Sequence, residues 1–505
     1  MEMTNKMMIK AGITSRLMAT CKQTLLFMLL AVTTTTAASE LPDFRPCRAR
    51  PHKPVAAIDG KTLHRTSRTT QYTGERRQMT VLVSFNDLTF REHEPLPFWN
   101  EVFNAKEFSQ APFHGSVSDY FYDQSYGQLQ VHFDLHHVLL PTSRTLYRSN
   151  LTADPGCPIL VQDVLAALDG IVTDWTPYDW NADGYVDQLL IIYPGKGMND
   201  GGDYNTIWPN QSWMTDYDYE PVKVPTATAG DSLMVNTYCC VNELTSNEDY
   251  GSFGTICHEY SHCFGLPDFY NGSTQHVAKW DLMDNGNYNG GGFCPPCYSV
   301  HERMFMGWTT PTELTATTSI SNMQPANSQQ QAYIIRSQQD DNDYYIVENR
   351  QQQGWDKELP GSGILIFHVK YDEEVWLHGM PNTSFQSAAA NRYTLKKANG
   401  SNSTYRQGQW AYPYQDNDSL TALSQPASDY EGKSLTDISV SSDGLASFTY
   451  HQTDVSAIHA LSTDRSTTQD ACYDLLGRRM VGKHQPSGLY VIRFSDGTTK
   501  KVAVK

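Results

Sequence analysis

Two histidines lie four residues apart, His258 and His262, in the stretch ICHEYSHCFGLPDFY. On a helix, residues at this spacing share one face about one turn apart, so both imidazoles can point at one metal ion. Gly265 can adopt a positive φ and turn the chain after the helix, which brings Asp268 back toward the metal. Three protein ligands and one open position are typical of a catalytic zinc ion.

Glu259 directly follows the first histidine and supplies a carboxylate beside the predicted zinc ion. Zinc lowers the pKa of its bound water to about 7, and Glu259 can accept the proton of that water and pass it to a leaving amine. The alternative is a helix with two hydrogen-bonded histidines and no metal. The extended pattern H-E-x-x-H-x-x-G-x-x-D makes that alternative the weaker one.

A second turn-forming stretch, WDLMDNG, follows about a dozen residues later and contains Met283. Metzincins carry a Met-turn beneath the metal, so Met283 is the predicted residue of such a turn. A methionine in ordinary packing is the alternative when the stretch is taken alone. Tyr288 lies close by in the sequence and is a candidate to stabilise an oxyanion, although a tyrosine in a surface loop is the simpler interpretation.

The stretch DWNADGYVD places oxygen-bearing groups at alternating positions around a glycine. Oxygen ligands at such positions suit calcium, although Leu190 at the twelfth position excludes an EF-hand. The predicted ligands are side-chain oxygens and one backbone carbonyl: Asp179, Asn181, Asp183, Tyr185 and Asp187. We expect this calcium to be structural, and an acidic turn without a cation is the alternative.

Elements that would position these residues are visible in the apolar patterns around them. MTVLVSF and DQLLIIY are typical of buried strands, GSVSDYFYDQSYGQLQVHFDL of a helix, a turn and a strand, and CPILVQDVLAALDGIV of a helix. Together with the motif they predict an α+β catalytic domain of the zincin, metzincin-like type over residues 79–310. QAYIIRS, DYYIVEN and GILIFHVKY predict a mainly β region over residues 311–452 that continues the peptidase.

The start of the chain predicts export. A basic segment, the short apolar run LLFMLLAV and small residues near Ala37 are typical of a signal peptide over residues 1–38. Residues 39–78 are interpreted as a leader or propeptide, and Cys47 within it invites the hypothesis that its thiolate occupies the open zinc position until cleavage. No later apolar run is long enough for a transmembrane anchor. The formal charge of −17 argues against a nucleic-acid binder, since affinity for nucleic acids depends on neutralising phosphates.

The run GTICHEYSHCFGLPDFY, followed by WDLMDNG, resembles the immune inhibitor A family of secreted bacterial zinc metallopeptidases. Further similarity lies in GSVSDYFYDQSYGQLQV, DWNADGYVDQLLIIYPG and YYIVENRQQQGWDKELPGSGILIFHVKY, so that it spans roughly residues 79–380. This resemblance implies that His258, His262 and Asp268 bind zinc and that Glu259 is the catalytic acid and base.

The tail over residues 453–505 differs from the acidic body of the chain. Residues 455–505 contain eight Lys or Arg and four Asp or Glu, and this change of charge supports a separate module. YDLLGRRMVGKHQPSGLYVIRFSDGTTKKVAVK resembles the C-terminal sorting domains of the type IX secretion route. The resemblance implies a small β-sandwich-like domain and transit through the periplasm by outer-membrane secretion machinery, and an ordinary β module is the alternative.

These observations predict a secreted or cell-surface zinc endopeptidase that hydrolyses extracellular proteins or peptides with a zinc-activated water and Glu259 as general base. The alternative from another class is a non-catalytic surface adhesin or binding protein on a metallopeptidase scaffold. All expected ligands and the base are present in the sequence, which favours the enzyme. A zinc hydrolase with a non-peptide substrate and the oligomeric state both stay open.

Overall fold

The computed structural model describes residues 72–148, 156–271, 274–377, 381–382, 391–401, 403–421, 423, 430–453, 469–474, 479–480, 488–494 and 499–504. The chain divides into two compact units, Met1–Cys297 with Glu373–Ala390 and Tyr298–Asp372 with Asn391–Lys505. The signal peptide predicted over residues 1–38 and Cys47 of the predicted leader lie outside the described residues. These two interpretations therefore stay predictions.

The first unit is built on a five-stranded sheet with the strand order β2-β1-β4-β8-β5. Four neighbouring strands run parallel, and β5 is an antiparallel edge strand on β8. The strands are β1 (Gly74–Phe85), β2 (Leu129–Leu140), β4 (Leu189–Lys196), β5 (Asn210–Trp213) and β8 (Thr237–Leu244). The last eight residues of β1 are all buried, as expected for a parallel strand covered on both faces.

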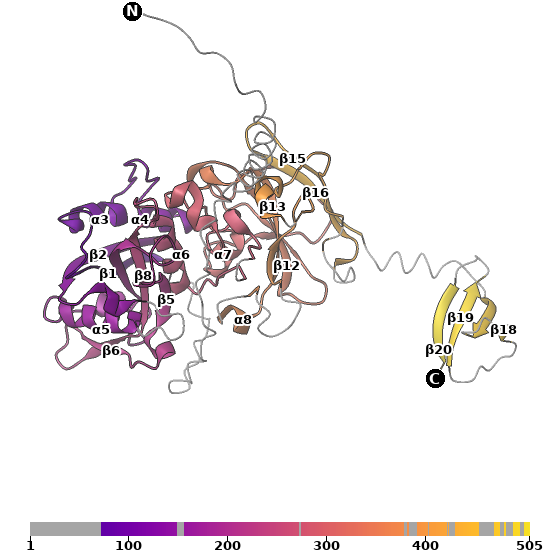
Figure 1. Cartoon of the computed structure of the whole chain (residues 1–505). Coiled ribbons are helices and arrows are strands. Elements are labelled where there is room, and N and C mark those ends of the chain that lie inside the picture. The colour runs from indigo at the N-terminus through magenta and orange to yellow at the C-terminus, as the bar shows by residue number, and fades with distance from the viewer. Residues whose placement is uncertain are drawn as a thin grey trace, which may run out of the picture. The chain divides into compact units, whose positions relative to one another are not determined.

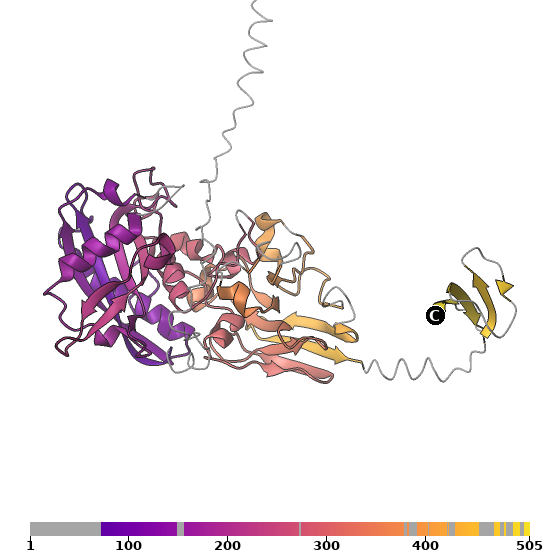
Figure 2. The same cartoon turned by 90° about the horizontal axis from the view of Figure 1, so that it is seen from below.

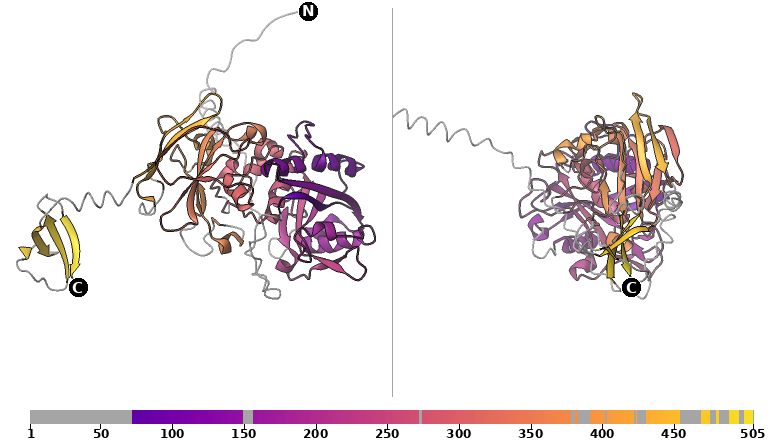
Figure 3. Two further views of the ribbon diagram at one scale, coloured as in Figure 1. Left: turned by 180° about the vertical axis from the view of Figure 1, so that it is seen from behind. Right: turned by 90° about the vertical axis from the view of Figure 1, so that its right-hand side faces the viewer.

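Helices cover both faces of this sheet (Figure 1). On one face, Val81 and Val83 of β1 share a core with Leu160 and Val164 of α5 (Gly156–Leu168). On the other face lie α3 (Pro95–Asn104), α4 (Val117–Gln124) and α6 (Phe253–Cys263). Figures 2 and 3 show the same elements from below and from behind. The first unit is therefore a mixed α/β unit. Its sheet is largely parallel and has helices on both faces, a feature that the predicted α+β class did not specify.

The segment predicted as helix, turn and strand has this structure. Ser116 caps α4 reciprocally with Asp119: the Asp119 N–H donates to the Ser116 hydroxyl, and the Ser116 N–H donates to the Asp119 carboxylate. β2 follows after a turn. By contrast, residues 74–77, which we predicted to belong to the leader, form the largely exposed start of β1.

Smaller elements complete the first unit. A three-stranded sheet has the order β3-β7-β6, and a short helix, α8, comes from the later part of the chain. Their bounds are β3 (Tyr185–Val186), β6 (Val222–Pro225), β7 (Ser232–Val235) and α8 (Glu373–Leu377).

The second unit confirms the predicted β-rich region. A sheet of order β14-β13-β12-β11-β9 and a sheet of order β10-β16-β15 share one core, in which Val347 and Ile366 of the first sheet join Leu435 and Phe448 of the second. The elements are α7 (Val300–Phe305), β9 (Thr312–Glu313), β10 (Thr318–Met323), β11 (Tyr333–Arg336), β12 (Asp343–Arg350), β13 (Gly363–Lys370), β14 (Tyr393–Leu395), β15 (Lys433–Val440) and β16 (Ala446–Gln452).

The described part of the tail forms one sheet of order β18-β17-β19-β20. Its strands are β17 (Gln469–Asp474), β18 (Arg479–Met480), β19 (Gly488–Phe494) and β20 (Thr499–Val504). The predicted strands are present, but the described residues show no second sheet that would make a sandwich. Among the helices that the structure describes, none combines the length and the apolar character needed to span a bilayer.

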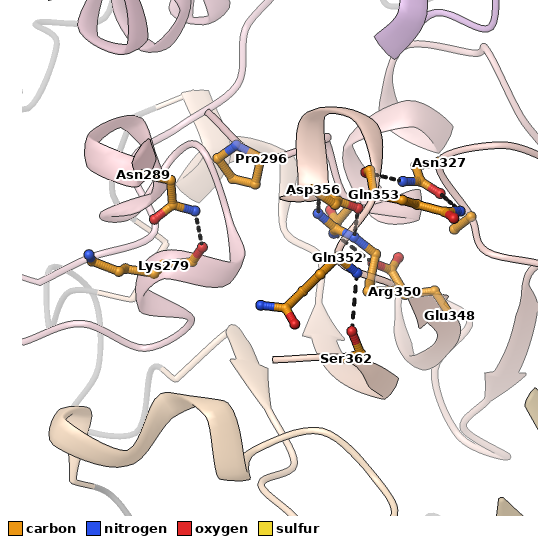
Figure 4. Close-up of polar contacts among 12 residues, drawn as sticks. Lys279, Asn289, Pro296, Asn327, Glu348, Arg350, Gln352, Gln353, Asp356 and Ser362 are labelled. Carbon is orange, nitrogen blue, oxygen red and sulfur yellow. Dashed lines mark hydrogen bonds and ion pairs between the residues drawn. The ribbon is translucent and has the colours of Figure 1, made fainter. Parts of the chain in front are cut away.

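A buried ion-pair cluster lies in the second unit (Figure 4). The Arg350 guanidinium donates two hydrogen bonds to Asp356, at 2.7 and 2.6 Å, and one to Glu348 at 3.0 Å. All three side chains are fully buried. The other Glu348 oxygen accepts the backbone N–H of Val300 at 2.7 Å, which ties α7 to β12. Removing the guanidinium would leave Asp356 and Glu348 buried without this ion pair, and of the two carboxylates Glu348 would still feel the charge of the buried Arg303.

We expect Arg350→Met to destabilise the protein by about 3–5 kcal/mol, since one partner of a buried pair is lost. The matched control is Arg336→Met, because Arg336 pairs with Glu313 at 3.5 Å near the surface, where such pairs contribute about 1 kcal/mol or less. Urea-induced unfolding measures both variants. A loss for Arg350→Met no larger than that of the control would contradict this account.

Candidate active site

Helix α6 places the two histidines of the motif on one buried face. Nine of its eleven residues are buried, and the ring centroids of His258 and His262 lie 5.0 Å apart. The helix ends at Cys263, and Gly265 then adopts a φ of +84°, the left-handed turn that the sequence predicts. This turn redirects the chain so that Asp268 faces the two imidazoles.

The three predicted ligands converge in the structure. Asp268 Oδ1 lies 3.1 Å from His258 Nε2 and 3.4 Å from His262 Nε2. The Asp268 side chain is 1% exposed, and its two oxygens accept no hydrogen bond of regular geometry from the described residues. Within the described part of the chain, this is the group of His, Cys, Asp or Glu side chains whose ligand atoms gather within 4.8 Å.

Backbone carbonyls set the tautomer of both rings. His258 Nδ1 lies 2.8 Å from the carbonyl oxygen of Leu282, and His262 Nδ1 lies 2.7 Å from that of Leu266. A carbonyl only accepts hydrogen bonds, so each Nδ1 carries the proton and each Nε2 directs its lone pair toward Asp268. Two lone pairs facing a buried carboxylate require a cation or a proton between them. The donor set therefore fits zinc, for which imidazole and carboxylate are ordinary ligands.

In the metal-free protein, the close approach of these three side chains shifts the pKa of each. Burial lowers the pKa of His258, but the Asp268 carboxylate, 3.1 Å from His258 Nε2, outweighs this and raises the pKa to about 9. The pKa of His262 is also raised, by the same carboxylate against burial. Burial opposes ionisation of Asp268, yet the two imidazoles hold the pKa of that carboxyl well below its usual range.

The turn that contains Met283 holds two parts of the site. Leu282 provides the carbonyl for His258, and the next carbonyl, that of Met283, accepts the N–H of Phe269 at 2.8 Å, directly after Asp268. The Met283 N–H in turn donates to Asp281 Oδ1 at 2.8 Å, and the Met283 side chain is completely buried. The predicted Met-turn therefore lies beside the predicted ligands and connects them.

Glu259 and Tyr288 line one cleft together with His258. Glu259 is almost fully buried, while Tyr288 is partly exposed. The structure thus brings the predicted acid–base residue and the candidate oxyanion stabiliser to the same opening as one predicted ligand. Cys257 and Cys263 flank the ligands, and burial raises the pKa of both thiols, as in cysteines that pack as small apolar groups.

The predicted calcium loop has a different arrangement. Its carboxylates accept backbone N–H groups of the loop itself: Asp179 accepts from Asp183 and Gly184, Asp183 from Tyr185, and Asp187 from Trp180. Among the described residues, Asp179, Asp183 and Asp187 do not form a gathered ligand group. The structure therefore does not support the calcium site, whose members Asp179, Asn181, Asp183, Tyr185 and Asp187 stay a prediction.

The sequence reasoning missed other residues of the cleft, which include Asn199, Tyr270, Asp284 and Asn287. Asp284 directly follows Met283 in WDLMDNG, so its place in the predicted turn could have identified it as a residue near the site. Asn199 and Tyr270 come from distant segments and carry no recognisable spacing. The carbonyls of Leu266 and Leu282 could not be recognised either, because every residue has one.

Fold and site together define a candidate metallohydrolase, and comparisons with known proteins agree. Residues 173–307 match the family described as Immune inhibitor A peptidase M6, catalytic domain. Immune inhibitor A of Bacillus thuringiensis subsp. alesti is 28% identical over 132 residues, which are 24% of this chain and 19% of that protein. Pre-pro-metalloprotease PrtV of Vibrio cholerae serotype O1 is 26% identical over 143 residues, which are 26% of this chain and 15% of that protein.

The chain spans less than a fifth of the length of these curated relatives. The matched segment nevertheless contains the histidines, Asp268 and the Met283 turn. These matches support a metalloprotease hydrolase with an immune inhibitor A-like catalytic domain and a catalytic metal, typically zinc. The resemblance predicted over residues 79–380 is supported over residues 173–307.

We expect Asp268→Ala to lower zinc affinity by more than about a hundredfold, since even outer-shell partners of metal ligands change affinity by 10- to 100-fold. The measurement is competition with a chromogenic chelator. Asp169→Ala, at an exposed position just after α5, is the matched control and should leave affinity unchanged. Equal affinity of Asp268→Ala and parent would remove Asp268 from the ligand set.

Zinc binding should release protons at pH 7. The pKa of His258 in the metal-free protein, about 9 against an ordinary 6.5, keeps this imidazole protonated, whereas zinc binds the neutral ring. Apparent affinity should therefore rise as pH is raised toward about 9 and gain nothing more from this residue above it. Titration calorimetry in buffers of different ionisation enthalpy counts the protons, and a count of zero at pH 7 would contradict this assignment.

Proposed function

We propose that this chain is a zinc-dependent endopeptidase of the metzincin-like zincin type, with Glu259 as general base. One observation carries this proposal: Glu259 lines the same cleft as His258, whose Nε2 converges with that of His262 on the buried Asp268 carboxylate. A base beside a three-ligand metal group is the arrangement that metal-assisted hydrolysis requires. The match to a peptidase domain supports the peptide as substrate.

The residues divide the chemistry among them. Zinc held by His258, His262 and Asp268 would supply Lewis acidity that lowers the pKa of a water in the cleft. Glu259 accepts a proton from that water as the water oxygen attacks the scissile carbonyl carbon. The same carboxyl then gives the proton to the amine nitrogen as the carbon–nitrogen bond breaks. The products are a carboxylate and a free amine.

Tyr288 has a position suited to a supporting role. It lines the cleft with His258 and Glu259, and its hydroxyl can donate a hydrogen bond to the carbonyl oxygen as that oxygen gains charge. Such a donor acts on the transition state more than on the bound substrate. Loss of the hydroxyl should therefore lower kcat more than it changes KM.

Export to the cell surface or the medium completes the proposal. The signal-peptide pattern of residues 1–38 supports it, and so does the resemblance of residues 453–505 to type IX sorting domains. The partners would be extracellular proteins or peptides and the outer-membrane secretion machinery. A non-catalytic adhesin on the same scaffold is the competing proposal, and the complete donor set with its adjacent base speaks against it.

We expect Glu259→Gln to lower peptide hydrolysis by about 10²–10⁴-fold, the usual contribution of a general acid–base group, while zinc stoichiometry stays at parent level. Cleavage of a mixed peptide library and metal analysis of the same samples measure the two effects. Glu101→Gln, an exposed glutamate of α3, is the matched control. Equal cleavage by Glu259→Gln and parent would exclude Glu259 as the base, and no cleavage by zinc-loaded parent would favour the adhesin.

A further inference from the structure

The cleft beside the predicted zinc ligands contains a second buried carboxylate, that of Asp284. Asp284 is 1% exposed, and its Oδ2 accepts three backbone N–H groups, from His276, Val277 and Ala278, at 2.9, 2.9 and 2.8 Å. These bonds fix the carboxylate in place. Its Oδ1 accepts no hydrogen bond from any residue that the structure describes. Oδ1 is therefore the oxygen left for a group that enters the cleft.

Two amide oxygens in the same cleft share this condition. Asn287 Oδ1 and Asn199 Oδ1 are buried, and neither has a hydrogen-bond donor within the described part of the chain. The Asn287 backbone lies close to α6. A Cβ added to Gly254 would lie only 1.9 Å from the Asn287 carbonyl oxygen, so glycine permits this approach. Buried acceptors without donors are unfavourable unless a ligand satisfies them. The cleft thus offers three acceptors, one of which can carry a negative charge.

The described lining of this cleft carries two carboxyl groups and one histidine, the predicted zinc ligand His258. Burial raises the pKa of Asp284 to about 7, against the three backbone N–H groups that lower it, and the nearby Asp281 raises it further. Glu259 is the second carboxyl group, and the residues that the structure describes in this lining include no Lys or Arg. A cation that entered would stabilise the ionised form of Asp284.

Aromatic side chains complete the walls. Trp208, Tyr270 and Tyr288 line the cleft with the carboxylates. Aromatic faces attract cations and also pack against the methylene stems of long basic side chains. An entering group that combines an aliphatic stem with several N–H donors would therefore match both the walls and the acceptors.

We propose that this cleft binds a Lys or Arg side chain of the peptide substrate next to the scissile bond, with Asp284 Oδ1 as its main acceptor. Asn287 and Asn199 accept further hydrogen bonds from the same cation. Asp284 thereby determines specificity and takes no part in the bond-breaking steps. This inference rests on the proposed peptidase function and names its substrate class.

The test uses zinc-loaded full-length protein and peptides acetylated at the N-terminus, which excludes a free amino terminus as the bound cation. One series of peptides varies the residue before the scissile bond, and a second series varies the residue after it. In each series the varied residue is Lys, Arg, norleucine or Glu. Norleucine keeps the aliphatic stem and lacks the charge. We expect kcat/KM for Lys or Arg to exceed that for norleucine by about tenfold or more at one position.

Two variants that change the charge of the cleft in opposite directions test whether the cleft causes this preference. Asp284→Asn keeps one oxygen for the backbone N–H groups and replaces the other by a donor, so the ratio of kcat/KM for Lys over norleucine should fall toward one. Asn287→Asp adds a carboxylate of the same shape, so the ratio should rise. Zinc content and thermal unfolding identify a variant that fails to fold. In that case the ratio measured for the other variant decides whether the cleft causes the preference.

The outcomes separate this inference from the proposed function. If the parent cleaves peptides with no preference for Lys or Arg, the inference is wrong and the peptidase assignment stands. If the parent cleaves nothing, fluorescence anisotropy measures binding of the same peptides to the Glu259→Gln variant. Tighter binding of the Lys peptide that Asp284→Asn abolishes supports the cation site without the peptidase. Equal binding of the Lys and norleucine peptides overturns the inference as well.

Discussion

Two backbone carbonyls, those of Leu266 and Leu282, carry the geometry on which the rest of the site depends. Each accepts the Nδ1–H of one histidine and so turns its Nε2 lone pair toward the Asp268 carboxylate. Both carbonyls lie in turns after α6, so the helix supplies the spacing of the histidines and the turns supply their orientation. A buried carboxylate facing two such lone pairs is stable only with a cation or a proton between them.

The parallel sheet provides the support for this arrangement. Helix α6 lies on one face of the sheet, where the Tyr260 hydroxyl donates to Gln78 of β1 at 2.9 Å. The Ser252 hydroxyl donates to the carbonyl of Glu243 at the end of β8, which anchors the start of the helix. Gly254 lets the Asn287 backbone approach the helix closely. The wall that holds Asp284 and Asn287 is thus fixed to the helix that holds the histidines, so the proposed substrate recognition and the proposed chemistry would share one scaffold.

Local patterns in the sequence were sufficient to predict most elements and the convergence of His258, His262 and Asp268. HExxH spacing, Gly265 and the turn around Met283 encode their own geometry, because helix periodicity and a positive φ act over a few residues. Long-range features could not be read in this way. The parallel strand order arises from packing on both faces, Asn199 reaches the cleft from a distant loop, and the carbonyls of Leu266 and Leu282 have no side-chain signature. The acidic loop at 179–187 shows that a local pattern can also fit two structures. Carboxylates at this spacing suit calcium, but here they accept hydrogen bonds from the loop's own N–H groups.

Diffraction from crystals of zinc-loaded Glu259→Gln protein, recorded at energies on both sides of the zinc absorption edge, tests the central claim most directly. The account predicts one anomalous peak about 2.0–2.2 Å from His258 Nε2, His262 Nε2 and an oxygen of Asp268. Both Nδ1 atoms should keep their bonds to the leucine carbonyls. A peak elsewhere, or no peak between these three side chains in protein that contains stoichiometric zinc, would contradict it.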